Sequence, residues 1–154
     1  MAKATRRRPA GEAGLAVIDL MAAAMVLAIL GAIAIPAFFG FHRGAQDRSA
    51  QSEIARVLAH EKTLWQERGE YTDATGDLSA LVPGVVGDGA DPGAGVTLTV
   101  NRPAGTLCIE RASGSGVTFA VWESAELGTF YGRGGGLTGA CPGTPPAGYT
   151  SDGW

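Results

Sequence analysis

The feature that most constrains the fold of this chain is a run of 22 consecutive uncharged residues, Leu20 to Phe41, near its start. As an α-helix with a rise of 1.5 Å per residue, this run would extend roughly 33 Å, about the thickness of one hydrocarbon core. A basic cluster precedes the run and none of similar density follows it, which favours a cytoplasmic N-terminus. The sequence therefore predicts a single membrane-spanning helix followed by an exported domain.

One carboxylate, Asp19, lies directly before this run, inside the apolar stretch that begins at Leu15. A charge in lipid costs several kcal/mol, and neither a signal peptide cut near Ala32-Ile33-Ala34 nor an ordinary signal anchor gives a reason to keep it. A cut after Gly14 would make Leu15 the new N-terminus, with its ammonium one helical turn from Asp19. The two charges would then neutralise each other, within one chain or between neighbours, which favours side-by-side assembly.

Residues 8 to 41 resemble the N-terminal segment of the type IV pilins and their pseudopilin relatives. In that family a short basic leader ends in Gly, the mature chain opens with a hydrophobic residue, an acid stands fifth and a Pro stands twenty-second. Gly14, Leu15, Asp19 and Pro36 match all four positions in register, although the family's fifth residue is usually Glu. The resemblance implies cleavage after Gly14 by a prepilin peptidase, N-methylation of Leu15, and a role of Asp19 as the assembly charge.

Two residues are expected to weaken this helix. Pro36 removes one backbone hydrogen bond, leaves the carbonyl of Ala32 without a donor and disfavours helical geometry at Ile35. Gly31, five residues earlier, has low helix propensity, so we expect the segment between them to be the weakest part of the helix and to kink. The resemblance further implies local unwinding here when subunits pack into a filament.

Beyond Phe41 the sequence becomes mixed in charge, but apolar residues at helical spacing predict that the helix continues and packs one face on the following domain. Arg68 followed by Gly69 predicts its end. Glu61 falls near the middle of this apolar stripe; we expect it to reach the rim, to pair with Lys62 or Arg68 of another stem, or to mark a narrower stripe. The stripe consists of Ile54, Leu58 and Trp65, with Val57 and Leu64 on its flank.

The remainder of the chain is rich in Gly, Pro and Thr and contains four β-type runs joined by short turn sequences, which predict an antiparallel meander. We expect one face of this sheet, including Leu107, Ile109, Phe119 and Val121, to lie over the stem stripe. Residues 72 to 95 predict a connecting loop, with a short helical turn at 78 to 81. The four runs are 96–100, 106–111, 117–124 and 129–133.

The fold class is therefore α+β: a long N-terminal helix packed on a small antiparallel sheet, as in pilins. The resemblance extends weakly to "QERGEYTD", which looks like the Gly-x-Tyr passage that closes the pilin stem and docks an aromatic ring on the head. The expected organisation is a leader (1–14), an apolar membrane and polymerisation half of the stem (15–41), an amphipathic half (42–68) and a β-rich head (69–154).

Cys108 and Cys141 are the only two cysteines, and both lie in the head. An exported head would let them pair, and the loop-entropy estimate for such a bridge is roughly 3 to 4 kcal/mol of stabilisation. Two buried free thiols are the alternative. The resemblance implies a disulfide that bounds an exposed C-terminal loop, here formed by residues 134–136 and 142–146.

Several function classes receive no support from the sequence. Residues 69 to 154 carry three basic and nine acidic side chains, so we expect no direct nucleic-acid contact by the head. No nucleophile has a partnered base, and we expect His42 and His60 to be solvated, so we predict no enzyme activity and no cofactor. Four acids, Asp73, Asp77, Asp88 and Asp91, lack the spacing of a calcium loop, and we expect no metal site.

The resemblance implies a structural subunit of a type IV pilus that is inserted in the cytoplasmic membrane and then polymerises with itself into an extracellular surface filament. A major pilin is expected before a minor pilin or a pseudopilin. Its other partners would be the prepilin peptidase, the assembly platform and the platform's ATPase, with adhesion and motility as the associated activities. Outside this family, the alternatives are a single-pass anchored surface domain and a soluble domain released by signal peptidase.

Overall fold

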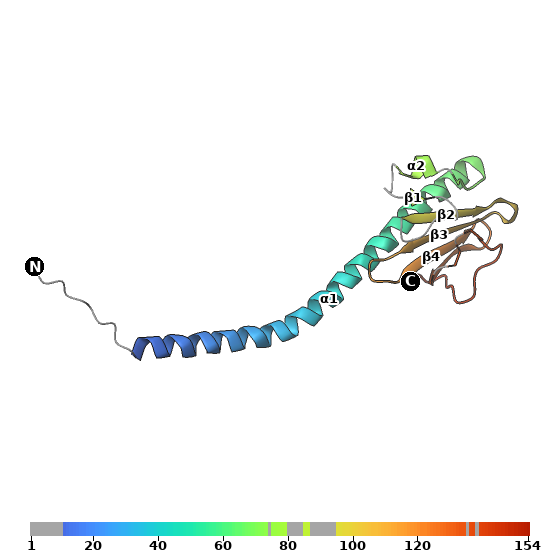
Figure 1. The fold of residues 1–154 in the computed structure, drawn as a ribbon. Coiled ribbons are helices and arrows are strands. Elements are labelled where there is room, and N and C mark those ends of the chain that lie inside the picture. Colours follow the sequence, from blue (N-terminus) through green and yellow to red (C-terminus); the bar gives the residue numbers. More distant parts are fainter. Residues whose placement is uncertain (1–10, 74, 80–84, 87–94, 135, 138) are drawn as a thin grey trace, which may run out of the picture. The chain divides into compact units, whose positions relative to one another are not determined.

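A computed structural model of the chain describes residues 11–73, 75–79, 85–86, 95–134, 136–137 and 139–154. Its contacts divide the chain into two units, Met1–His42 and Arg43–Trp154. One helix, α1 (Gly11–Arg68), runs through the first unit and into the second (Figure 1). The second unit adds a one-turn helix, α2 (Thr75–Ser79), and a five-stranded sheet. This is the α+β layout expected from the sequence.

The strands follow one another in the sheet in chain order, β1 to β5. The four longer strands pair antiparallel, which confirms the expected meander, and the bounds of each lie within one residue of the predicted run. The two-residue strand β1 (Val85–Val86) pairs parallel with β2 in a region predicted as loop, so that prediction was wrong there. The other strands are β2 (Val96–Asn101), β3 (Thr106–Ala112), β4 (Thr118–Ser124) and β5 (Gly128–Arg133).

The second half of α1 packs against one face of this sheet. Ile54 and Val57 are fully buried there, and Leu58 and Leu64 are nearly so. These helix side chains pack on every second residue of the strands, because alternate side chains of a strand point to the same face of the sheet. The stripe and its partner face are thus confirmed; the sheet contributes Val96, Leu98, Leu107, Ile109, Phe119 and Val121 to this core.

Polar contacts hold α1 on the sheet at three points along its length. Near the first point, hydroxyl groups of the β3–β4 turn donate hydrogen bonds to Asp47, and these bonds keep the pKa of its carboxyl below the ordinary value. In the middle, Arg111 Nε donates to Glu53 Oε2 at 2.8 Å. Towards the end of the helix, Lys62 Nζ donates to Thr129 Oγ1 at 2.7 Å.

The helix ends where the sequence predicts. Gly69 adopts a left-handed conformation (φ 74°), and its N–H donates to the Trp65 carbonyl at 2.8 Å. This bond satisfies one of the carbonyls that a helix leaves free at its C-terminus. Tyr71 then turns into the core, with its ring centroid 4.6 Å from that of Trp65. The aromatic docking that the Gly-x-Tyr passage implies is therefore present.

The opposite face of the sheet is covered by the C-terminal segment. Trp122 is fully buried on this face, and its indole Nε1 donates to the Pro142 carbonyl at 2.8 Å. Farther along, Thr150 pairs with Tyr131 of β5 through two backbone hydrogen bonds. The expected exposed loop is thus partly wrong, because Pro142 is anchored to the sheet. The second cluster contains Cys108, Ala120, Trp122, Leu137 and Cys141, with Phe130 and Tyr149 at its edge.

Candidate functional site

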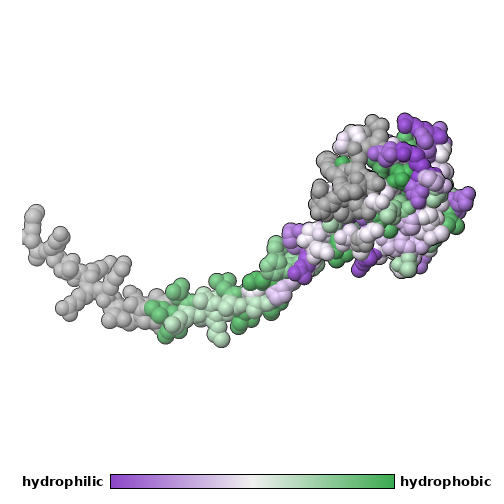
Figure 2. Space-filling model, turned by 45° about the vertical axis from the view of Figure 1, so that its right-hand side comes forward, coloured by the Kyte–Doolittle hydropathy of each residue, from purple (hydrophilic) through white to green (hydrophobic). Residues whose placement is uncertain are grey.

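The apolar part of α1 is exposed along its length, and Figure 2 shows its hydrophobic residues in green. Leu20 is 72% and Phe41 80% exposed. The helix is long and apolar enough to cross a membrane, with a mean hydropathy of 2.5 in its most apolar stretch and none of that stretch buried. The helix of a soluble core would be mostly buried, whereas an exposed apolar surface of this length is typical of a segment that contacts lipid or an apolar partner. Its other exposed large residues are Val17, Ile18, Met21, Met25, Val26, Leu27, Ile29, Leu30, Ile33, Ile35, Phe38 and Phe39.

Asp19 is exposed within this apolar surface. Among the described residues, no cation lies within ion-pair distance of it. The backbone of Gly14 and Leu15 belongs to the first turns of the same helix, so Leu15 precedes Asp19 by about one turn. The expected cut site and the carboxylate therefore lie on one continuous helix. Cleavage and charge pairing stay predictions.

The residues at Gly31 and Pro36 are both helical in the single chain, because α1 runs through both positions, and the expected kink between them stays a prediction. An internal proline removes one hydrogen bond, but the bonds on either side of it can keep a long helix continuous. A Cβ placed on Gly31 would meet no atom within 4 Å, so close packing within this chain does not explain the glycine. Unwinding on filament formation stays a prediction.

The two histidines differ in their surroundings. His42 is exposed as expected, and its ring stacks on that of Phe38 with centroids 6.2 Å apart and planes 3° apart. His60 is half-buried, and its Nε2 is buried with no hydrogen-bond partner among the described residues. The expectation of a solvated His60 was therefore wrong.

Glu61 is the least expected residue of the head. It is 0% exposed, which excludes both a position at the rim and pairing with a neighbouring stem. Its Oε2 accepts a hydrogen bond from the Thr72 N–H at 2.8 Å, and its Oε1 is buried without a partner in the described part of the chain. Burial raises the pKa of Glu61 to about 7, and the nearby Asp73 carboxylate adds to the increase, while the Thr72 bond opposes it. The helical spacing of the sequence placed Glu61 in the apolar stripe, but nothing in the sequence indicated that its carboxyl would be protonated.

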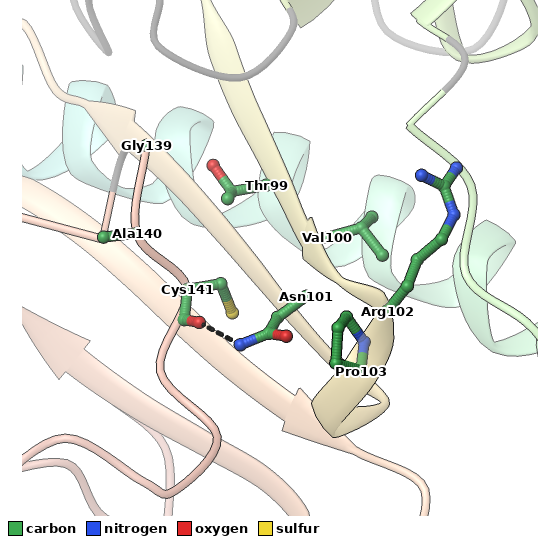
Figure 3. A pocket seen from close by; sticks show the side chains of 8 residues that line it. All are labelled: Thr99, Val100, Asn101, Arg102, Pro103, Gly139, Ala140 and Cys141. Carbon is green, nitrogen blue, oxygen red and sulfur yellow. Dashed lines mark hydrogen bonds between the residues drawn. The ribbon is translucent and has the colours of Figure 1, made fainter.

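Cys108 of β3 and Cys141 of the C-terminal segment form the expected disulfide, with Cα atoms 5.5 Å apart. Beside it lies an open cavity of about 320 Å³ between β2 and the C-terminal segment (Figure 3). The Asn101 side chain spans one end of it, donating from Nδ2 to the Cys141 carbonyl at 2.7 Å and accepting from the Ala104 N–H. The disulfide thus fixes the segment that covers the second face of the sheet.

The lining of this cavity contains few charged side chains. Of the described residues that line it, only Arg102 is charged, and its Nη2 donates to Asp73 Oδ1 at 2.8 Å. It offers no acid or base for catalysis. Within the described residues no group of three or more His, Cys, Asp or Glu is placed to hold a metal ion, and Asp88 and Asp91 lie outside those residues.

Comparison of the chain with protein-family models, curated proteins and solved structures gave no match. The candidate site is therefore defined by the chain itself: an exposed apolar helix segment with one carboxylate near its start, in the same chain as a disulfide-linked head.

Proposed function

We propose that this chain is the precursor of a type IV pilin, most simply a major pilin. It is inserted in the cytoplasmic membrane, cut after Gly14, N-methylated on Leu15 and polymerised through residues 15–41 into a surface filament. The observation that carries the proposal is the exposed apolar segment of α1 with Asp19 near its start. The proposed role is structural, with no enzyme activity and no cofactor.

The physical reason for assembly is the charge of Asp19. In lipid a lone carboxylate is costly, whereas beside an ammonium in the same apolar medium it is stabilised. Cleavage after Gly14 supplies that ammonium on Leu15, and packing several stems together lets the N-terminus of one chain meet Asp19 of the next. Apolar contacts between stems then add to the charge pairing.

The head supports an exported product. Its disulfide joins β3 to the C-terminal segment, and disulfides persist mainly in oxidising compartments outside the cytoplasm. By analogy with the family, the prepilin peptidase, the assembly platform and its ATPase are the remaining partners.

A single-pass anchored surface domain is the second candidate, because one exposed apolar segment would suffice to hold the head at a membrane. Mass measurement and N-terminal sequencing of the exported form separate the two. A start at Leu15 supports the pilin, an intact Met1 or Ala2 supports the anchor, and a start near Ile35 or Ala37 contradicts both. Purified surface filaments in which this chain predominates would favour a major pilin over a minor pilin or pseudopilin.

A further inference from the structure

The side of α1 opposite the sheet is exposed between Ala45 and Thr63 and consists largely of small residues. Two of its hydroxyl groups bond back to the helix backbone: Ser52 Oγ donates to the Ser49 carbonyl and Thr63 Oγ1 to the Ala59 carbonyl, both at 3.0 Å. Such bonds satisfy the hydroxyls without solvent. Apart from two arginines, the exposed side chains of this face are small, so another surface can approach the helix closely between them.

Two arginines on this face, Arg48 and Arg56, are exposed. Neither forms an ion pair with a residue in the described ranges of the chain. The acid between them in sequence, Glu53, is already occupied by Arg111 at 2.8 Å. The outer face of α1 therefore carries uncompensated positive charge, although the chain as a whole has a formal charge of −3.

The turn between β4 and β5 carries an apolar side chain and a negative charge, which complement the outer face of α1. Leu127 is 57% exposed and is the only exposed large hydrophobic side chain among the described residues of the second unit. Glu126 beside it is exposed and makes no ion pair with any residue that the structure describes. The turn is fixed in shape, because Ser124 Oγ accepts the Glu126 N–H at 3.3 Å and Gly128 adopts a left-handed conformation (φ 86°). Lys62 further ties the base of this hairpin to α1 through Thr129.

We propose that the β4–β5 turn of a second copy docks on the outer face of α1, with Leu127 against the small residues and Glu126 paired with Arg56. The turn brings an apolar tip and a negative charge, and the face offers mostly small side chains and a positive charge. The two surfaces differ, so each subunit can use both at once, and such a contact builds an open series of subunits instead of a closed dimer. The inference rests on the proposed function and names a contact from head to stem between filament subunits.

Charge exchange tests this contact in the full chain, expressed in its own host and assayed as sheared surface filaments. Arg56→Glu and Glu126→Arg are each expected to lower filament yield about fivefold, the factor that corresponds to ~1 kcal/mol for an exposed ion pair. The combined variant is expected to recover, because the pair is restored with its charges reversed. Leu127→Ser should also lower the yield, and Leu127→Met should retain it.

Arg68→Glu is the matched control: Arg68 is exposed on the same helix, and twelve residues turn it by about 120° from Arg56. It should leave the yield unchanged and should not rescue Glu126→Arg. Mass analysis of each variant checks that the leader is removed and that the disulfide forms. Wild-type filaments together with unaffected single variants, or with no recovery in the combined variant, overturn this contact and leave the pilin proposal standing. A correctly trimmed wild-type chain that forms no filaments overturns both.

Discussion

Replacing Glu61 by Gln is expected to remove much of the pH dependence of the head's stability between pH 5 and 8. In the folded chain this carboxyl is fully buried, holds the Thr72 N–H through one oxygen and has no partner for the other. Its pKa is raised to about 7, first by burial and then by the charge of Asp73. Gln is uncharged at every pH and keeps an oxygen for the Thr72 bond.

The sign and size follow from proton linkage. Between the ordinary pKa of 4.5 and the folded value of about 7, the folded chain holds a proton that the unfolded chain releases, so the free energy of unfolding falls as pH rises. Each pKa unit corresponds to about 1.4 kcal/mol, so this difference makes about 3 kcal/mol, fully present below pH 4.5 and lost above pH 7. Asp47 and Asp73 act in the opposite direction, because their pKa values are lowered and their contributions are lost only in acid.

The measurement is urea unfolding of the full chain in detergent micelles, followed by fluorescence of the three tryptophans, at several pH values from 5 to 8. The quantity of interest is the slope with pH, because any unpaired Gln amide in place of Oε1 adds a cost that does not change with pH. Glu67→Gln, an exposed carboxylate on the same helix, is the control and should follow the wild type. Parallel pH curves for Glu61→Gln and the wild type would refute the claim that Glu61 is protonated in the fold.

Four further outcomes are expected. With the leader still trimmed, Asp19→Asn should reduce filament yield to background in sheared fractions, and unchanged yield would end the charge-pairing account. Replacing Cys108 and Cys141 by Ser should lower the free energy of urea unfolding by roughly 3 to 4 kcal/mol, and an unchanged value would contradict the loop-entropy account of this disulfide. Gly132→Ala should destabilise the head by about 1 to 3 kcal/mol in the same assay, because its Cβ would overlap the Tyr149 ring, whereas Gly76→Ala, with open space around it, should not. A fragment of residues 43–154 should unfold cooperatively near the denaturant midpoint of the full chain, while residues 69–154, which lack Ile54 and Val57, should show no cooperative transition.

The helix and the main core were predictable because their signals are local and periodic. Ile54 and Leu58 recur at helical spacing, Gly69 supplies a stop signal, and alternate residues such as Leu107 and Ile109 identify the buried face of a strand. Each of these patterns depends on neighbours within a few positions. The layout of α1 on the sheet follows from them almost directly.

The remaining features depend on contacts that no local pattern encodes. Glu61 accepts a hydrogen bond through one oxygen from a backbone N–H eleven residues later, which a side-chain pattern does not reveal. The second face of the sheet is covered by Leu137 and Tyr149, isolated apolar residues in a segment of Gly and Pro without periodicity. The strand β1 has only two residues, Val85–Val86, too few to show alternation.

The other carboxylates of this chain show why Asp19 requires a compensating charge that the described part of the uncut chain does not supply. Glu110 is buried and accepts the Leu137 N–H at 2.9 Å, and Glu123 is buried with Lys62 Nζ at 3.3 Å. Glu61 is less fully compensated than either Glu110 or Glu123, and it is partly protonated near neutral pH. Asp19 lies among apolar side chains without an ion pair in the described part of the chain, so in lipid its compensation has to come from elsewhere. A new N-terminal ammonium on Leu15, of the same or a neighbouring stem, is the cation that the proposed cleavage would bring to that position, and this links removal of the leader to assembly.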